Sequence, residues 1–199
     1  MTESLDLQAL ADRLGPLCAS GADERDAADA FAAGNYALLK EHKVFSALVP
    51  RDLGGGGASH SAMCAFLRRL ATFCPSTALA LSMHQHLVAA ALYNHRHGRP
   101  GAELLTRVAA TQPVLVSTGA NDWMASSGKM TRADGGFHVS ARKPFGSGSV
   151  SGGVLVTSAP FDDPREGWHV LHFAVPFTAP GVSLADDWHS LGMRASGSN

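Results

Sequence analysis

The sequence predicts an α+β fold, with an all-helical domain over residues 1–111 followed by an antiparallel β-barrel-like domain over residues 112–199. In the first half, apolar residues recur every three or four positions, which is the spacing of one helix face. From Pro113 the apolar period changes to about two, which is the spacing of a half-buried strand. No helical pattern separates the later segments, and this favours an antiparallel sheet or barrel over a doubly wound parallel sheet.

The helical half is predicted to hold five helices. Leucines repeating at three- and four-residue steps support the first, and the second runs from the break at "SGAD" to near His42. Pro50 and four consecutive glycines then interrupt the pattern, since neither residue type suits a helix interior. The fourth helix is apolar nearly all round, so we expect it to be central and buried. The third, fourth and fifth helices are expected at residues 63–70, 76–93 and 101–110.

The second half is predicted to consist of short strands. Residues 128–143 form the strongest hairpin signal, because Asp134 and Gly135 supply the turn between two alternating segments. The other expected strands are β-rich runs bounded by small residues. They lie at residues 113–119, 153–159 and 168–176, and a further strand is expected to begin within 181–188.

Composition and charge exclude several classes of protein. The chain has 199 residues, of which 45% are hydrophobic and 17% charged, with a formal net charge of −1 and no basic stripe. We therefore expect no nucleic-acid partner. Three cysteines without CxxC spacing predict buried free thiols and a reducing, cytoplasmic location. The N-terminus lacks the regions of a signal peptide, and His84, Gln85 and His86 interrupt the most apolar segment, so no membrane association is expected.

Common catalytic and phosphate-binding motifs are absent or incomplete. The stretch "RKPFGSGSVSGG" (142–153) begins like a dinucleotide-binding loop, but Ser151 replaces the third glycine and no helix pattern follows. The histidine pairs are two residues apart in expected helices, where they face different directions, so no metal site is predicted. Asp122 and the other aspartates lie in turn-like contexts, where solvated carboxylates are the default interpretation.

Small polar residues, glycines and single aromatic residues gather at three strand ends, within 116–122, 141–149 and 187–199. Glycine allows a flat ring to approach the backbone, and a neighbouring aromatic side chain can stack on that ring. Hydroxyl and amide groups can bind ring heteroatoms or a pyrophosphate. This combination suits a flavin site, while barrel turns that need glycine for their geometry are the alternative.

The ordered segments "FSALVPRDLGGGG", "STALALSMHQHL", "VLVSTGAND", "DGGFHVSARKPFGSGS", "HFAVP" and "DWHSLGMRASGS" resemble the acyl-CoA dehydrogenase family of flavoenzymes. The resemblance runs from about residue 25 to the end of the chain. It implies a helical domain, a β-barrel-like domain and a C-terminal helical bundle. It also implies a bound FAD, with FMN the less favoured flavin, and a role in fatty acid metabolism.

The resemblance assigns site residues by position. Ser117, Thr118 and Asn121 match the family loop that contacts the flavin ring and pyrophosphate, although the loop here is shorter and lacks a Glu-Pro pair. Phe145 takes the place of a tryptophan beside the flavin, and Ser147 that of a hydroxyl near its N5 edge. Arg194 and Ser196 match the end of the β domain. Met83, His84 and Leu87 on the central helix are expected to line the substrate pocket.

Two departures from the family pattern affect the expected function. The chain stops at Asn199, so the C-terminal bundle, which supplies the catalytic base in the family, is expected to be missing, and no catalytic residue is assigned. The Phe-x-Ser-Gly pattern also resembles branches that contain reduced-flavin monooxygenases. The main expectation is α,β-dehydrogenation of an acyl thioester such as an acyl-CoA, with a separate electron acceptor. A monooxygenase supplied by a flavin reductase is the alternative, and a non-catalytic partner-binding remnant is the third possibility. A full-length form is expected to be a homo-oligomer.

Overall fold

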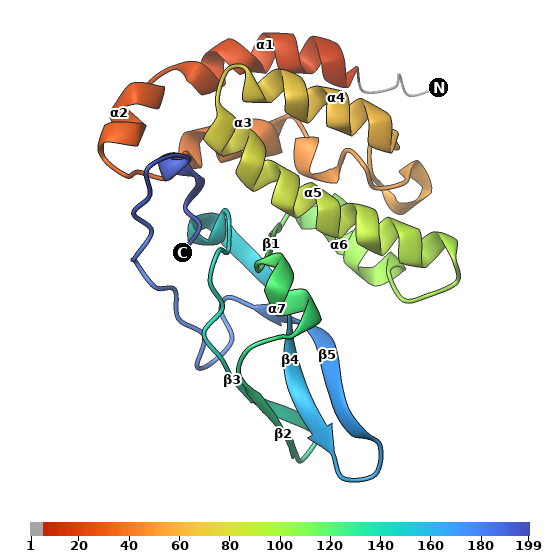
Figure 1. Ribbon diagram of the computed structural model, residues 1–199. Helices are drawn as coiled ribbons and strands as arrows, with labels where there is room; N and C mark the ends of the chain where they lie inside the picture. The colour runs from red at the N-terminus through yellow and green to blue at the C-terminus, as the bar shows by residue number, and fades with distance from the viewer. Residues whose placement is uncertain (1–5) are drawn as a thin grey trace.

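The computed structural model describes residues 6–199, apart from the side chain of Asn121. Helices gather at one end of the molecule and two β-hairpins extend from the other (Figure 1). The helical part contains six α-helices and two 3-10 turns among these residues. They are α1 (Leu7–Ala19), α2 (Ala22–Ala27), α3 (Ala33–Glu41), η1 (Val44–Ser46), η2 (Arg51–Leu53), α4 (His60–Ala71), α5 (Pro75–Arg96) and α6 (Ala102–Thr111).

The expected helices are present, with one difference. The single helix predicted after "SGAD" is divided into α2 and α3, and Asp29 between them has a left-handed backbone with φ of 51°. The expected central helix is α5, which begins at Pro75, a residue that suits the first helical position. Its buried side chains belong to a core that also includes β1 (Val114–Ser117).

The strand part is mixed, and the described residues form no closed barrel. Strands β1, β4 (Gly152–Asp163) and β5 (Gly167–Pro176) make one sheet in the order β1-β4-β5. β4 and β5 pair antiparallel, but β1 and β4 pair parallel. The predicted barrel and its wholly antiparallel pairing are therefore wrong. The long connection from β1 to β4 supplies the crossover that a parallel pair requires.

The sheet does not extend beyond β1 because a helix covers that edge. The backbone N–H of Leu115 donates a hydrogen bond to Nδ1 of His84 on α5, at 3.0 Å. A side chain of the core thus satisfies a group that another strand would otherwise pair with.

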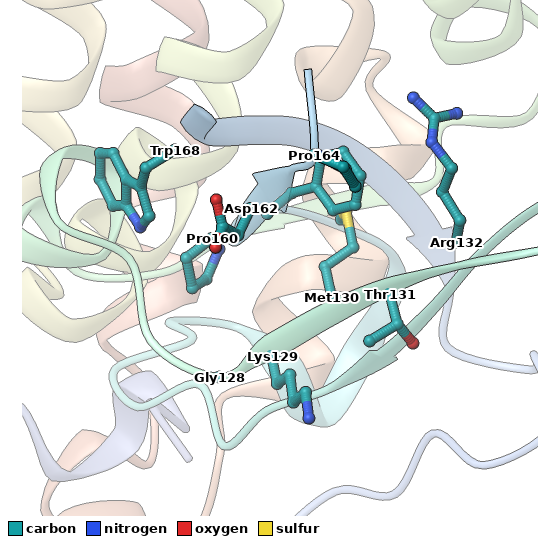
Figure 2. A pocket seen from close by; sticks show the side chains of 10 residues that line it. Gly128, Lys129, Met130, Thr131, Arg132, Pro160, Asp162, Pro164 and Trp168 are labelled. Atoms are coloured by element: carbon teal, nitrogen blue, oxygen red, sulfur yellow. The ribbon is translucent and has the colours of Figure 1, made fainter. Parts of the chain in front are cut away.

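The predicted hairpin is present as β2 (Lys129–Ala133) and β3 (Gly136–Ser140), which pair antiparallel and form a separate sheet. It packs against β4 and β5 through a small core of Met130, Ala159 and Phe161. A hollow of about 400 Å³ lies beside this core, and Figure 2 shows Met130 between Trp168 and Arg132 there. The region 181–188, where a further strand was expected, is irregular. The remaining elements are the short helices α7 (Ala120–Met124), η3 (Ser149–Ser151) and η4 (Arg194–Ser196).

The C-terminal segment returns to the helical part and lies beside α2 (Figure 1). The backbone N–H of Ala32 donates to the carbonyl of Ala195 at 3.2 Å, and Arg194 forms an ion pair with Asp29 at 2.8 Å. The core likewise extends from the helices into β1 and the start of β4. The division of the chain at residues 111 and 112 stays a prediction.

Two of the three cysteines agree with the expected buried thiols. Cys18 and Cys74 are buried, whereas Cys64 is exposed on α4. Burial, followed by the neighbouring Cys74, raises the pKa of the Cys18 thiol to about 11, so this group stays protonated at neutral pH. Of the described helices, none is both long and apolar enough to cross a membrane.

Candidate functional site: a groove beside Phe145

A groove of about 950 Å³ lies between two parts of the chain. One part is β3 and the segment that follows it, and the other is the irregular segment that follows β5. Its volume lies within the range of small-molecule and cofactor sites. Most of its lining is apolar and aromatic. The lining residues fall mainly within 137–146, 173–177, 180–189 and 198–199. These ranges overlap two of the three strand ends that the sequence marked as candidates, 141–149 and 187–199.

Phe145 presents its ring to this groove. The ring is 60% exposed and meets Trp188 edge-on, with 6.4 Å between the ring centroids. The backbone of Phe145 has φ of 62°, which is unfavourable for a bulky residue. Such strain persists only where the surrounding structure fixes the conformation, and it gathers at ligand sites. An exposed aromatic ring held in a strained conformation therefore makes this wall of the groove the candidate binding surface.

Trp188, which the sequence reasoning did not select, is fixed by the C-terminal segment. Its Nε1 donates to the carbonyl of Arg194 at 3.1 Å, and its backbone N–H donates to Oδ1 of Asn199 at 2.9 Å. The indole and the Phe145 ring are nearly perpendicular, at 85°. Together they give the groove two aromatic surfaces from segments 43 positions apart, which no local pattern connects.

Ser147 lies behind the groove in a chain of buried hydroxyl groups. Its Oγ is 2.8 Å from Oγ of Ser198, which in turn is 2.7 Å from Oγ of Ser196. Two backbone hydrogen bonds join the same segments, from Gly146 N to the Asn199 carbonyl and from Gly148 N to the Ser196 carbonyl. The segments 146–149 and 196–199 are thus held side by side, and the groove side of this chain is Ser198.

Ser117 and Thr118 lie at the end of β1, next to the groove residue Val116. Ser117 is fully buried, and its hydroxyl has no hydrogen-bond partner among the described residues. Thr118 Oγ1 donates to Oδ2 of Asp122 at 2.7 Å. The side chain of Asn121 lies outside the described part of the structure. The predicted roles of these three residues in flavin binding stay predictions.

Asp122 is not a solvated turn carboxylate, and that interpretation was wrong. Oδ1 accepts from Lys143 Nζ at 2.7 Å, from Ser127 N at 3.0 Å and from Ser127 Oγ at 2.9 Å. Oδ2 accepts from Thr118 at 2.7 Å and from Thr157 at 3.0 Å. Burial raises the pKa of Asp122, but the hydrogen bonds from Lys143, Thr118 and Ser127 outweigh it and hold the pKa well below the usual range.

The Asp122–Lys143 ion pair joins the loop after β1 to the segment that carries Phe145. The side chains of Lys143 and Asp122 are 8% and 6% exposed. Asp122 directly follows Asn121, the last residue matched to the family loop, but no local pattern in the sequence marked it as buried. The partner, 21 positions away, could not be recognised from spacing.

The residues predicted to line the substrate pocket lie on α5 and do not border the groove. His84 and Leu87 are buried, and Met83 is half-buried. Both ring nitrogens of His84 are engaged, because Nε2 lies 2.9 Å from the Phe45 carbonyl and Nδ1 accepts from Leu115 N. In this structure His84 joins α5 to η1 and β1. The assignment of Met83, His84 and Leu87 to a substrate pocket stays a prediction.

The donor set around the groove fits a flavin better than a metal ion. No group of three or more His, Cys, Asp or Glu side chains among the described residues is placed to hold a metal. The exposed aromatic face of Phe145, the Ser198 hydroxyl and the apolar lining surround a space large enough for an isoalloxazine ring. Within the described lining, Asp187 is the sole carboxylate, and it forms an ion pair with Arg142.

Comparison with known proteins decides the family. Residues 9–111, about half of the chain, match the model of the acyl-CoA dehydrogenase N-terminal domain. The chain belongs to the acyl-CoA dehydrogenase family. This confirms the resemblance drawn from the ordered sequence segments.

Relatives of this family member cover nearly all of the chain. It is 29% identical over 198 residues to the probable FMNH2-dependent monooxygenase SfnC of Pseudomonas putida, covering 96% of this chain and 47% of that protein. It is 33% identical over 201 residues to the amino sugar nitrososynthase RubN8 of Streptomyces rubradiris, again covering 96% and 47%. The chain therefore spans about half the length of the curated relatives it matches.

A solved structure supports the same fold. KijD3, in complex with FMN and dTDP-3-amino-2,3,6-trideoxy-4-keto-3-methyl-D-glucose, aligns with a TM-score of 0.86 and 28% identity. The alignment covers 98% of this chain and 50% of KijD3. SfnC is named as a probable FMNH2-dependent monooxygenase, RubN8 as an amino sugar nitrososynthase, and KijD3 was solved with FMN; none of the three is named as an acyl-CoA dehydrogenase.

Proposed function

We propose that this chain is part of a monooxygenase that uses reduced FMN to transfer one oxygen atom from O2 to a small organic molecule. The groove beside Phe145 carries this proposal, because it offers an exposed, strained aromatic residue in a cavity of cofactor size. Relatives over 96% of the chain include an FMNH2-dependent monooxygenase, which supports the same chemistry. Bound FMNH2 supplies the two electrons that split O2, so that one oxygen atom enters the substrate and the other leaves as water.

The chain's own residues would bind and orient the flavin. Phe145 would cover one part of the ring, and Ser147, through its hydrogen bond to Ser198, would set the direction of a hydroxyl near the N5 edge. Ser117, Thr118 and Asn121 would border the ring and phosphate side. The Ser117 hydroxyl has no hydrogen-bond partner among the described residues, but it is fully buried and outside the groove lining, so its role rests on the family resemblance.

The relatives support oxygen transfer more than α-proton abstraction. The family resemblance places the base for α-proton abstraction in the C-terminal bundle, so the groove lining does not bear on that choice. SfnC is named as an FMNH2-dependent monooxygenase and KijD3 was solved with FMN, and these two names carry the preference for oxygen transfer.

We propose FMN as the cofactor in place of the FAD expected from the family resemblance. The expected role in fatty acid metabolism is replaced by oxygen transfer to a small molecule. The relative SfnC is named for FMNH2, and KijD3 was solved with FMN. The amino sugar nitrososynthase relative suggests a substrate with an oxidisable amine nitrogen. A flavin reductase would supply FMNH2. The whole protein would be a homo-oligomer, and this part of it would consist of a helical domain at 1–111 and a β domain at 112–199.

Flavin binding by the 199-residue chain is the first test. Adding the protein to a fixed concentration of FMN should quench the fluorescence of the flavin. The same titration with FAD should give a higher Kd. FMNH2 from an added reductase, with 18O2 and a nucleotide-linked amino sugar, should then yield product carrying one labelled oxygen atom. Turnover of an acyl-CoA with an artificial electron acceptor, without labelled product, would instead support the dehydrogenase. Failure to bind either flavin would count against both enzymes and favour a partner-binding role.

A further inference from the structure

Lys143 belongs to the groove lining, but every partner of its ammonium group lies outside that lining. Nζ donates to Asp122 Oδ1 at 2.7 Å and to the Ser127 carbonyl at 2.8 Å, with Ser126 and Ser127 hydroxyls both at 3.3 Å. The three protons of an ammonium group are therefore engaged within the protein. Lys143 is consequently suited to fixing its own segment, and not to binding a phosphate group in the groove.

Asp122 fixes the other end of this contact to the sheet. Its Oδ2 accepts from Thr157 on β4, and its backbone carbonyl accepts from Ser158 Oγ on β4 at 2.6 Å. β4 is the central strand of its sheet, paired with β1 on one side and β5 on the other. The ion pair thus connects the ammonium group of Lys143, through Asp122, to the central strand of this sheet.

Phe145 follows Lys143 by two residues, and its strained backbone is held from both directions. Pro144, between them, restricts the chain through its fixed φ. On the far side, Gly146 N donates to the Asn199 carbonyl at 3.0 Å. A residue with φ of 62° needs such support, because an unconstrained phenylalanine would return to negative φ.

We propose that Lys143, held by Asp122, is a positioning residue that keeps the Phe145 ring in its flavin-binding orientation. This inference rests on the proposed function for its ligand, since the ring is the surface on which FMN would bind. The ion pair acts through the backbone of residues 143–145 and makes no contact with the flavin.

A double-mutant cycle tests whether Lys143 acts through Phe145. Lys143→Met keeps the stem and removes the charge, and it should weaken FMN binding about tenfold, as should Phe145→Ala. The combined variant should bind no more weakly than Phe145→Ala alone, because the positioned ring is already gone. Effects that multiply in the combined variant would overturn the proposal. Arg69→Met, which removes an exposed ion pair with Asp12 on the helices, is the matched control and should bind FMN normally.

A second variant separates positioning from general loss of stability. Lys143→Met leaves the buried Asp122 carboxylate without its cation, so Asp122→Asn/Lys143→Met removes both charges and should recover thermal stability. We expect this double variant to remain about tenfold weaker in FMN binding. Recovery of both stability and FMN affinity would show that Lys143 is only structural.

Amide hydrogen exchange provides a readout that does not require flavin. Peptides covering residues 141–149 should exchange faster in Asp122→Asn/Lys143→Met than in the parent chain or Arg69→Met, because the segment loses its anchor. Unchanged exchange would overturn the positioning role even if FMN binds. Faster exchange in a protein that binds no FMN would support the anchor and reject the proposed function, so the two failures are distinguishable.

Discussion

The buried His84 makes a specific prediction about stability and pH. Nδ1 accepts from Leu115 N, so it carries no proton, and Nε2 donates to the Phe45 carbonyl. Burial lowers the pKa of His84 to about 4, partly opposed by the Phe45 hydrogen bond and assisted by the charges of Lys40 and His86. Protonation would place an N–H against the N–H of Leu115, at the contact that joins α5 to β1.

Proton linkage gives the sign and the size of the change in the free energy of unfolding with pH. The unfolded chain, with a His84 pKa near 6.5, binds more protons than the folded chain between pH 6.5 and 4, so the free energy of unfolding falls as pH falls through this range. From pH 7 to pH 5 the expected loss is about 2 kcal/mol. Asp122 has a folded pKa below its unfolded value, so its contribution is complete above pH 3.8 and does not change in this interval.

Urea unfolding at pH 7 and pH 5 measures this contribution when the parent chain is compared with His84→Gln. Glutamine keeps a donor and an acceptor but does not titrate, so the variant should lose about 2 kcal/mol less than the parent chain on acidification. The pKa of His86 is also lowered, and this residue is present in both proteins, so its effect cancels. His60→Gln, at an exposed position on α4, should retain the full loss. An equal pH dependence in the parent chain and His84→Gln would refute the reasoning.

Three further predictions concern the groove and the support beneath it. Gly148→Ala should lower the free energy of unfolding by about 2 kcal/mol or more, because φ is 77° and the added Cβ would lie 2.8 Å from the Tyr36 hydroxyl. Tyr36→Phe should change the free energy of unfolding by less than about 1 kcal/mol, since the Tyr36 hydroxyl has no partner among the described residues. Combined with Gly148→Ala, Tyr36→Phe should restore part of the lost stability. Phe145→Gly should relieve backbone strain and so raise the free energy of unfolding by up to about 1 kcal/mol. The same variant should bind FMN about tenfold more weakly in a titration. Urea unfolding checks all three, and a stable Gly148→Ala or a destabilised Phe145→Gly would contradict them.

Local sequence signals predicted the elements that depend on local physics. Apolar spacing located α1, α4, α5 and α6, and the Asp134-Gly135 pair located the turn between β2 and β3. Gly135 adopts φ of 75°, which that turn requires and glycine permits. The break between α2 and α3 was missed because residues 22–33 contain neither proline nor glycine, so no local signal marks the turn at Asp29.

The pairing of β1 with β4 could not be predicted from the same signals. Both strands show only apolar, β-rich segments, and their direction relative to each other depends on the path of the connection. Nor does any pattern near Leu115 indicate that a histidine on α5 closes the edge of the sheet. The sequence placed His84 on the correct helix. Its contacts with Phe45 and Leu115 depend on how the chain packs, which the sequence pattern does not show.

The candidate site shows the same limit and its physical origin. Local composition marked residues 141–149 as a possible site and the family resemblance then assigned Phe145 within it, and the groove does expose the Phe145 ring. What holds it there is assembled from distant parts of the chain: Asp122 through Lys143, Asn199 through Gly146, and Tyr36 beneath Gly148. Tyr36 belongs to the helical part and Asn199 to the end of the chain, so the conformation of this wall depends on contacts between distant parts of the chain. A helical part and a β part can be recognised separately in the sequence, but the orientation of Phe145 is a property of both packed together.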